Sequence, residues 1–561
     1  MGVAAQIFSL PSLTLAATAE SSIVIKFYAE PFSRLFNLNA HLEIVAVIFL
    51  ANYVFAALFW GFIYPRFFSP LRHLKGPRNL ISIAHRSLIV YDRPPGDLFL
   101  DVVKKYPGQE ILNLTAFEHQ VLVTSPRMLA DLLVHKPYEF IKPPKISGFL
   151  RHVLGDGLIM VEGDQHKFLR KNTMPAFSFR HIKDLYSMMW DKSVLMSDAL
   201  KEALGTGEGK DTNIIDLANW TSRVTLDIIG VAGMGREFNM LKKAEDPLLG
   251  IYEQLLEPAP EKLAFAMTSI LFGLPFVGLL PWKMNGLFRQ LTTTLSDYCM
   301  PMLQEKKEAI INSKDDHFDV LSLLIESGNF TDPQLRDQLL TFLAAGHETT
   351  SSALSWACYL LSKHPEIQDK LREEIHRALP DDMEIDKSTD LAGILEQLPY
   401  LNGIMNETLR LYPTVPLTMR EAVRDTNLAG QIIPQGVTVV ISMWQMNRSP
   451  DFWGAEAGEF RPDRWITSGK PNSNGGANSN YEFLTFLHGP RSCIGQGFAK
   501  AEMRCLLASM VRTFSWELAM DEKNIIPKGA ITIKPSNGLL LKLKPVTSNA
   551  ALTSEELGQR K

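Results

Sequence analysis

One cysteine stands in a stretch whose residue types and spacing can do chemistry. Residues 486–500 read FLHGPRSCIGQGFAK and place Cys493 in the pattern F-x-x-G-x-R-x-C-x-G. Glycines allow a tight turn that brings backbone N–H groups close to the sulfur, and the helical pattern that follows points its N-terminus at it. Both features favour a thiolate. Three roles are open to Cys493 from these residues: metal ligand, nucleophile or buried structural thiol.

A second stretch with unusual composition lies inside a long helical pattern. Asp332 followed by proline predicts a helix start with Asp332 as the N-cap, and the pattern continues to about Lys363. Residues 343–352 in its middle read LAAGHETTSS, where Gly346 and hydroxyl side chains that bond back to the i−4 carbonyl weaken a helix. Such a weak point leaves space and polar groups beside the backbone, or it is a harmless kink.

A third pattern pairs opposite charges. Glu407 and Arg410 stand at i and i+3 among apolar residues, on one face of a predicted helix. If the pair is buried it needs a further partner, and Arg464 in FRPDRW can complete a three-member network. We interpret this network as structural, with no role in proton transfer.

The elements that must position these residues are mostly helices. The chain has 561 residues, of which 46% are hydrophobic and 21% charged, as in a large globular protein. Helical periodicity dominates, and β-rich runs occur at 120–125 and 437–443, so we predict a mainly α fold with small peripheral β-sheets. A net charge of −4 gives no basic stripe for nucleic acid, and four cysteines without paired spacing favour a reduced, cytosol-facing compartment.

An apolar run near the start predicts a membrane anchor. Residues 44–64 carry no charge, and a helix of this length spans about 30 Å, the thickness of the hydrocarbon core. Positive charges gather after the run, at Arg66, Arg72 and Lys75, which predicts that the larger part of the chain faces the cytosol. Residues 265–281 are also apolar but are interrupted by glycine and proline. We interpret them as a surface loop that dips into the bilayer, with core packing as the alternative.

These patterns predict the boundaries of five parts. They are an N-terminal segment on the lumenal side (1–43), a transmembrane helix (44–64), a proline-containing hinge (65–77), one large catalytic domain (78–545) and a polar tail (546–561).

Together the motifs resemble those of the cytochrome P-450 haem-thiolate monooxygenases, from about Ser69 to Pro545. The cysteine loop is similar to the haem-binding signature of that family, AGHETT to its oxygen-activation motif, Glu407 and Arg410 to its Glu-x-x-Arg, and FRPDRW to its meander motif. The order and spacing of the four motifs agree as well. The chain is identified as a microsomal member that resembles fungal enzymes of specialised metabolism.

The resemblance implies a single haem domain with the cytochrome P-450 fold and haem b, iron protoporphyrin IX, as cofactor. The Cys493 thiolate is then the axial ligand of the haem iron, and Glu348 and Thr349 organise the water chain that protonates dioxygen. A bend at Gly346 opens space for the oxygen. The residues implied to pair with the haem propionates are Arg491, Arg420, His166 and Arg170.

Three residues depart from the pattern of the family. His166 stands where tryptophan is usual, so it is either a hydrogen-bond donor to the haem or a solvated surface histidine. Asp463 and Trp465 replace the usual glutamate and phenylalanine around Arg464, which should leave the role of that arginine intact.

The function implied is a monooxygenase of the endoplasmic reticulum membrane. It would use O2 and electrons from an NADPH-cytochrome reductase to oxidise a lipophilic small molecule, such as a terpenoid or polyketide. The predicted pocket walls are residues 143–158, Phe342, Ala345 and residues 413–418, which are apolar. The alternatives are a haem-thiolate isomerase or dehydratase that needs no reductase, an oxidase of fatty acids or xenobiotics, and a non-catalytic haem-binding membrane protein.

Overall fold

The chain divides into two compact units, which are described separately. The sheet unit comprises residues 1–89, 101–141 and 419–441, and the helical unit comprises residues 90–100, 142–418 and 442–561. The computed structural model describes residues 16–21, 41–59, 63–77, 93–114, 119–206, 212–242, 260–312, 319–529 and 531–546.

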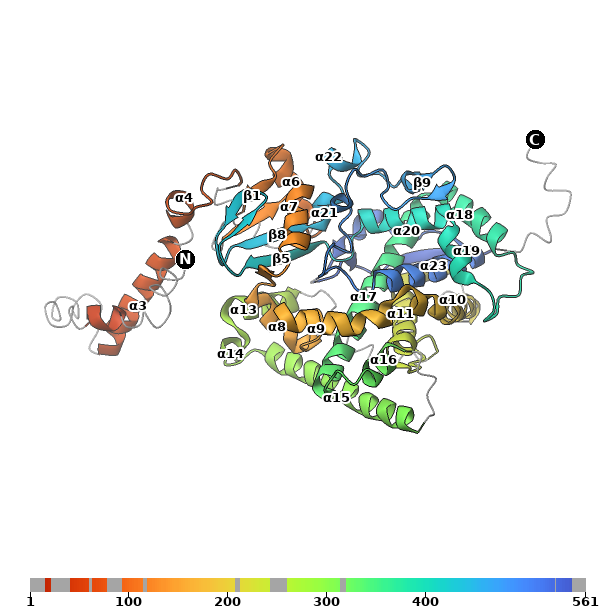
Figure 1. Ribbon diagram of the computed structural model, residues 1–561, viewed down its shortest axis with the longest axis horizontal. Coiled ribbons are helices and arrows are strands. Elements are labelled where there is room, and N and C mark those ends of the chain that lie inside the picture. Colours follow the sequence, from red (N-terminus) through yellow and green to blue (C-terminus); the bar gives the residue numbers. More distant parts are fainter. Residues whose placement is uncertain are drawn as a thin grey trace. The chain divides into compact units, whose positions relative to one another are not determined.

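The sheet unit is built around a five-stranded sheet, parts of which are visible in Figure 1. Its order is β1 (Ile111–Asn113), β2 (Gln120–Val123), β8 (Thr438–Ser442), β5 (Leu417–Ala422) and β3 (Phe140–Ile141). The strands β2 and β8 pair in parallel, which fits their continuous runs of buried β-branched and aliphatic residues. They confirm the two β-rich runs predicted at 120–125 and 437–443.

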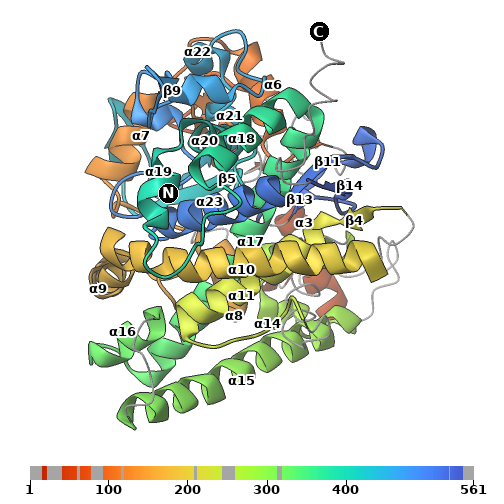
Figure 2. The same cartoon turned by 90° about the vertical axis from the view of Figure 1, so that its right-hand side faces the viewer.

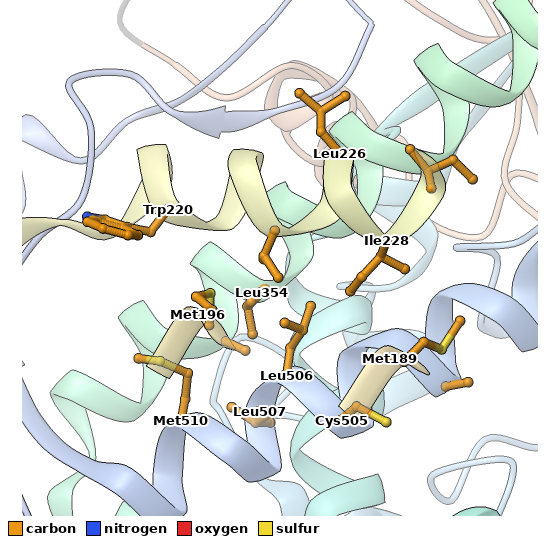
Figure 3. Packing of buried hydrophobic residues seen from close by; sticks show 14 of the residues in the cluster. Met189, Met196, Trp220, Leu226, Ile228, Leu354, Cys505, Leu506, Leu507 and Met510 are labelled. Atoms are coloured by element: carbon orange, nitrogen blue, oxygen red, sulfur yellow. The ribbon is translucent and has the colours of Figure 1, made fainter. Parts of the chain in front are cut away.

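Four helices form the core of the helical unit. They are α10 (Phe179–Thr206), α11 (Leu217–Met234), α17 (Asp332–Lys363) and α23 (Gln496–Thr513). Figure 3 shows Met196 of α10, Leu354 of α17 and Leu506 of α23 packing together beside α11. Figure 2 shows α11 and α16 (Val320–Glu326) between α10 and the long helix α15 (Lys283–Ile311). The mainly helical character of the fold, with small sheets, is therefore confirmed.

The predicted long helix is present with nearly the predicted bounds. One α-helix runs from Asp332 to Lys363, but its N-cap is Thr331 and not Asp332. The Thr331 side chain and Gln334 form a capping box, in which the backbone N–H of Thr331 donates to the Gln334 side-chain oxygen at 2.9 Å. Asp332 lies in the first turn instead and pairs with Lys307 of α15.

The other elements of the first half, in chain order, are α3 (His41–Leu58), α4 (Tyr64–Phe67), α6 (Asp97–Lys105), α7 (Pro126–Ala130), η2 (Asp131–His135), α8 (Pro144–Leu154), α9 (Gly163–Thr173), η3 (Met174–Phe177), β4 (Ile214–Asp216), α13 (Pro260–Phe272) and α14 (Leu274–Val277).

Those of the second half are α18 (Pro365–Ala378), α19 (Leu391–Gln397), α20 (Pro399–Leu411), β6 (Thr426–Leu428), β7 (Gln431–Ile433), α21 (Met443–Met446), α22 (Pro450–Trp453), η4 (Pro462–Trp465), β9 (Ile466–Thr467), β10 (Lys470–Pro471), η5 (Asn480–Glu482), β11 (Phe514–Leu518), η6 (Glu522–Asn524), β12 (Pro527–Lys528), β13 (Lys534–Pro535) and β14 (Leu540–Pro545).

The predicted anchor overlaps α3, while residues 60–62 of it lie outside the described residues. Within the part of the chain that the structure describes, no helix is long and apolar enough to cross a membrane. Most of the predicted N-terminal segment and all but the first residue of the predicted tail also lie outside the described residues.

Candidate active site around Cys493

The loop that carries Cys493 is a tight turn closed by its own backbone. The Cys493 N–H donates to the Phe486 carbonyl at 2.9 Å, and the Ser492 N–H donates to the Gly489 carbonyl at 3.1 Å. Gly489 has a φ of +80°, in the left-handed region that glycine adopts without steric cost. The helix α23 then begins at Gln496, with Gly495 as its N-cap. This turn leaves the Cys493 side chain exposed.

The electrostatics of the thiol differ from the sequence expectation. The hydrogen bond from the Gly495 backbone and the charge of Arg170 lower the pKa of Cys493, but desolvation by the dense protein around it is larger and the net pKa is raised. The side chain reaches solvent, so this desolvation comes from its packed surroundings and not from full enclosure. The turn and the helix therefore do not by themselves keep the sulfur anionic, and a bound metal ion would.

The cysteine loop is packed against the long helix α17. Phe486 contacts an apolar cluster that contains Ala353 of α17, Leu409 of α20 and Met503 of α23. Ala353 lies one helical turn after Thr349 and on the same face, because residues four apart align along a helix. The cluster thus links the cysteine loop to α17 one helical turn after Thr349.

The AGHETT segment keeps its helix and approaches α11 closely. A Cβ atom at Gly346 would lie 2.7 Å from Cδ1 of Ile229, so the glycine lets α17 approach the Ile229 side chain of α11 closely. The Thr349 hydroxyl donates to the Ala345 carbonyl at 2.8 Å, which is the back-bonding expected from the sequence. All residues from 332 to 363 stay in one α-helix.

Glu348 is the acidic group of this segment, and desolvation is the largest influence on its pKa. Desolvation raises the pKa of Glu348, while a hydrogen bond with the Thr532 hydroxyl and the charge of Lys534 oppose the rise. The segment around Thr532 is fixed on α17, because the Trp356 indole N–H donates to the Ile533 carbonyl at 3.2 Å. The pKa of the Glu348 carboxyl is thus raised towards the range in which the group can give and take protons near neutral pH.

A group of charged residues, here named the α9 cluster, borders the cysteine loop. It consists of Lys142, Glu162, His166, Arg170 and Arg491. His166 and Arg170 share one face of α9, at i and i+4. The Arg170 guanidinium donates to the Ser492 carbonyl at 2.5 Å, which joins α9 to the residue before Cys493. Arg491 forms an ion pair with Glu162.

His166 is buried, so the interpretation as a solvated surface histidine is wrong. Its side chain is only 4% exposed. Burial first, and then the charges of Arg491, Lys142 and Arg170, lower the pKa of His166 to about 4. It is therefore neutral at pH 7 and can donate a hydrogen bond but carries no charge.

Arg420 belongs to the sheet unit, whereas the other three residues implied for the propionates belong to the helical unit. It lies on β5, is buried, and its Nη1 donates to the Met419 carbonyl at 2.8 Å. Its role at a cofactor stays a prediction.

The Glu407 network is buried and closed. Arg410 is fully buried and donates to both oxygens of Glu407, each at 2.8 Å. Its remaining donors reach the carbonyls of Asn447 and Ala457 at 2.7 Å and that of Glu459 at 3.1 Å. The structure thus places a bidentate ion pair whose donors all end on protein acceptors.

Further donors converge on the Glu407 carboxylate from the meander. Arg464 donates from Nε at 2.9 Å, the Arg461 backbone N–H at 3.0 Å and the Trp465 indole N–H at 2.9 Å. Together these contacts keep the pKa of Glu407 low despite the opposing effect of desolvation, which is the largest single influence on it.

Three residues of these two groups were not found from the sequence. Trp465 was treated as a neutral replacement of phenylalanine, yet its indole N–H supplies a hydrogen bond that phenylalanine cannot. Glu162 and Lys142 belong to no motif. The one sequence feature that could have indicated Glu162 is its place as an acidic residue directly before a helix.

Comparison with known sequences gives consistent matches. The sequence model of the family described as cytochrome P-450 matches residues 75–542. Cytochrome P-450 monooxygenase sphH of Aspergillus fumigatus is 40% identical over 529 residues, which cover 93% of this chain and 97% of that protein. Cytochrome P-450 monooxygenase FUM15 of Gibberella moniliformis is 34% identical, covering 89% of this chain and 92% of that protein. Cytochrome P-450 monooxygenase ptmK of Penicillium ochrochloron is also 34% identical, covering 89% and 99%.

Proposed function

The chain belongs to the cytochrome P-450 family of oxygenases, and we propose that it oxidises a lipophilic small molecule of fungal specialised metabolism with O2 and electrons from an NADPH-cytochrome reductase. The observation that carries this proposal is the Cys493 loop, which presents a thiol in an open turn beside a positively charged cluster and against α17.

The residues around Cys493 fit a haem b group. A thiol is a soft ligand suited to iron, and the basic groups of the α9 cluster are suited to carboxylates. Cys493 would hold the iron, while Arg170, Arg491 and the neutral His166 would bind the propionates. Bound haem supplies the iron that activates dioxygen, and a thiolate ligand favours cleavage of the O–O bond.

The residues of α17 would manage protons at this site. The raised pKa of Glu348 allows its carboxyl to release a proton. The Thr532 hydroxyl, which is hydrogen-bonded to this carboxyl, can then pass a proton back to it. The Thr349 hydroxyl, which donates to the Ala345 carbonyl, can turn to donate to a water molecule instead. Both side chains stand on a helix fixed by the core, so their positions are set before the substrate binds.

The substrate is proposed to lie between α8, its following loop and α17. The Thr341 hydroxyl donates to the Leu154 carbonyl at 3.1 Å, and the Leu158 N–H donates to the Gln338 side chain at 3.2 Å. These bonds hold the end of α8 and its following loop against α17. The predicted walls are residues 143–158, Phe342, Ala345 and residues 413–418. An apolar wall with few polar anchors suits a terpenoid or polyketide skeleton.

We further propose that the enzyme is held at the endoplasmic reticulum membrane with its catalytic part in the cytosol. The charge-free run at 44–64 supports this proposal, and the outer side chains of α3, including Leu50 and Phe55, are exposed. The run at 265–281 adds exposed Phe272, Phe276 and Leu279, while its Phe265 is packed in the core. Apolar side chains exposed in this way are suited to an interfacial surface.

Spectroscopy and product analysis test the proposed function. We expect the reduced protein to give the carbon monoxide difference spectrum of a thiolate-bound haem, and Cys493→Ser to abolish it, with the buried Cys299→Ser as control. An unchanged spectrum in Cys493→Ser would refute the assignment. Mass spectrometry after co-expression with a reductase and candidate precursors then identifies the product. Turnover without a reductase would favour an isomerase or dehydratase instead.

A further inference from the structure

Glu162 has no role in the function proposed above, yet it is the only carboxylate in the α9 cluster. It directly precedes α9 and accepts a hydrogen bond from the Lys142 backbone N–H at 2.9 Å. Its carboxylate also lies 3.5 Å from the Lys142 ammonium and forms an ion pair with Arg491. The side chains of Glu162 and Arg491 are 22% and 5% exposed, so the pair is mostly removed from water.

The position of Glu162 is set by three separate segments of the chain. Lys142 follows β3, Glu162 precedes α9, and Arg491 stands two residues before Cys493. Because Arg170 also holds the Ser492 carbonyl, both arginines connect α9 and its N-cap to the cysteine loop. Glu162 therefore holds the guanidinium of Arg491, which belongs to the cysteine loop, against the start of α9.

The charges of the five described residues that make up the α9 cluster can be summed at pH 7. Lys142, Arg170 and Arg491 carry three positive charges, Glu162 carries one negative charge, and His166 is neutral because its pKa is lowered to about 4. The pKa of Glu162 itself is lowered by Lys142 and Arg491 despite opposing desolvation, so it is ionised. Three positive charges and one negative charge leave a net charge of two, which equals the charge of two carboxylates with opposite sign.

We propose that Glu162 is a positioning residue that holds Arg491 and sets the net charge of the α9 cluster to match the two propionates of haem. This inference rests on the proposed haem-thiolate function. Without Glu162, three cations would face two propionates. The surplus positive charge in a poorly solvated site favours the reduced, more negative iron.

Midpoint potentials of the full-length holoenzyme test this role, because they respond to charge and not to packing alone. We expect Glu162→Gln, which removes one negative charge at nearly constant shape, to shift the ferric/ferrous potential to a more positive value. Lys142→Gln removes a positive charge and should shift it in the opposite direction. The double variant restores the net charge and should return the potential close to that of the unchanged enzyme.

A matched control is Asp164→Asn in the first turn of α9. Its side chain is 94% exposed and pairs with Lys167, so its charge is screened and the potential should stay as it is. Potentials that do not move in Glu162→Gln, or that move in the same direction in both single variants, would overturn the proposal. If Glu162→Gln does not retain haem, a missing negative shift in Lys142→Gln overturns it instead.

Carbon monoxide difference spectra of the same samples separate the two possible failures. If the unsubstituted enzyme lacks the thiolate spectrum, the proposed function is refuted. If all variants show the thiolate spectrum but their midpoint potentials do not shift with the charge changes, only the role of Glu162 is refuted.

Discussion

The Glu407 network and the α9 cluster are built from the same kinds of side chain, but they differ in how their charges are balanced. Each has one glutamate between basic residues. Around Glu407 every donor of Arg410 reaches the carboxylate or a backbone carbonyl, and the arginine is fully buried. In the α9 cluster the positive charges exceed the negative charge by two, and the cysteine loop lies beside them.

The difference separates a group that stabilises the fold from a group that is ready to bind. A buried charge is costly unless its hydrogen bonds are all made, and the Glu407 network makes them within the protein. A cluster that keeps surplus charge offers attraction to an anionic ligand instead. Removing a member should therefore damage folding in the first region and ligand binding in the second.

The largest effect is expected from Glu407→Gln. Neutralising the carboxylate leaves the charge of Arg410 buried without a counter-ion, which should lower the free energy of unfolding by about 3–5 kcal/mol. Urea denaturation of the full-length protein measures this loss. The control is Glu517→Gln, whose carboxylate is 55% exposed beside Lys542 and should matter by less than about 1 kcal/mol. Equal losses in the two variants would contradict the distinction drawn here.

Trp465→Phe sharpens the same comparison with a smaller change. It removes one hydrogen bond to the Glu407 carboxylate and keeps an aromatic ring in the core, so we expect a loss of about 1.5–3 kcal/mol. Trp282→Phe is the matched control, because that indole N–H also donates to a glutamate, Glu261, but at an exposed site. A cost in Trp465→Phe no larger than in the control would show that the indole adds nothing to the network.

The sequence predicted the closed network better than its details. The i, i+3 spacing is enough to pair Glu407 with Arg410, and an arginine in the meander is an evident third member. The indole of Trp465 reaches Glu407 from 58 positions away, and no local pattern reports such a contact. The helix α17 was predicted almost entirely from its periodicity, and its N-cap was displaced by one because Thr331 and Asp332 are both capable caps.

The sequence predicted only those site residues that belong to a motif. Cys493, Glu348 and Thr349 were found in this way. Glu162 was not, because one acidic residue before a helix is common and its partner Arg491 lies 329 positions away. The direction of the pKa shift of Cys493 was also missed, because the turn and the helix are visible in the sequence and the dense protein packed around the thiol is not.

Lowering the pH tests whether a buried contact of a titratable side chain loses its contribution to stability when that side chain is protonated. His347 of α17 is buried against α11, where its Nδ1 lies 3.1 Å from the Thr225 hydroxyl, and burial lowers its pKa to about 3. The unfolded chain binds the proton near pH 6.5, so the stability from the neutral ring is complete above pH 6.5 and is lost as the pH falls towards 3. At pH 5.5 the loss should be about 1.4 kcal/mol.

Urea denaturation at pH 7.5 and pH 5.5 measures this change. His347→Gln cannot take up the proton, so its loss of stability between the two pH values should be smaller than that of the unchanged protein by this amount. Parallel pH dependences would mean that His347 is not kept neutral by the fold.

The smallest effect on folding is expected from Arg170→Gln in the α9 cluster, and it is the change that separates the two regions most directly. Its hydrogen bond to the Ser492 carbonyl is lost, which should lower the free energy of unfolding by about 1 kcal/mol. The loss of a charged donor to a propionate should at the same time accelerate haem release about tenfold or more.

Haem transfer to an apomyoglobin acceptor measures the rate of haem release, and urea denaturation measures the free energy of unfolding. A variant that loses several kcal/mol and releases haem at the original rate would place Arg170 with the Glu407 network, as a residue that stabilises the fold and not the ligand.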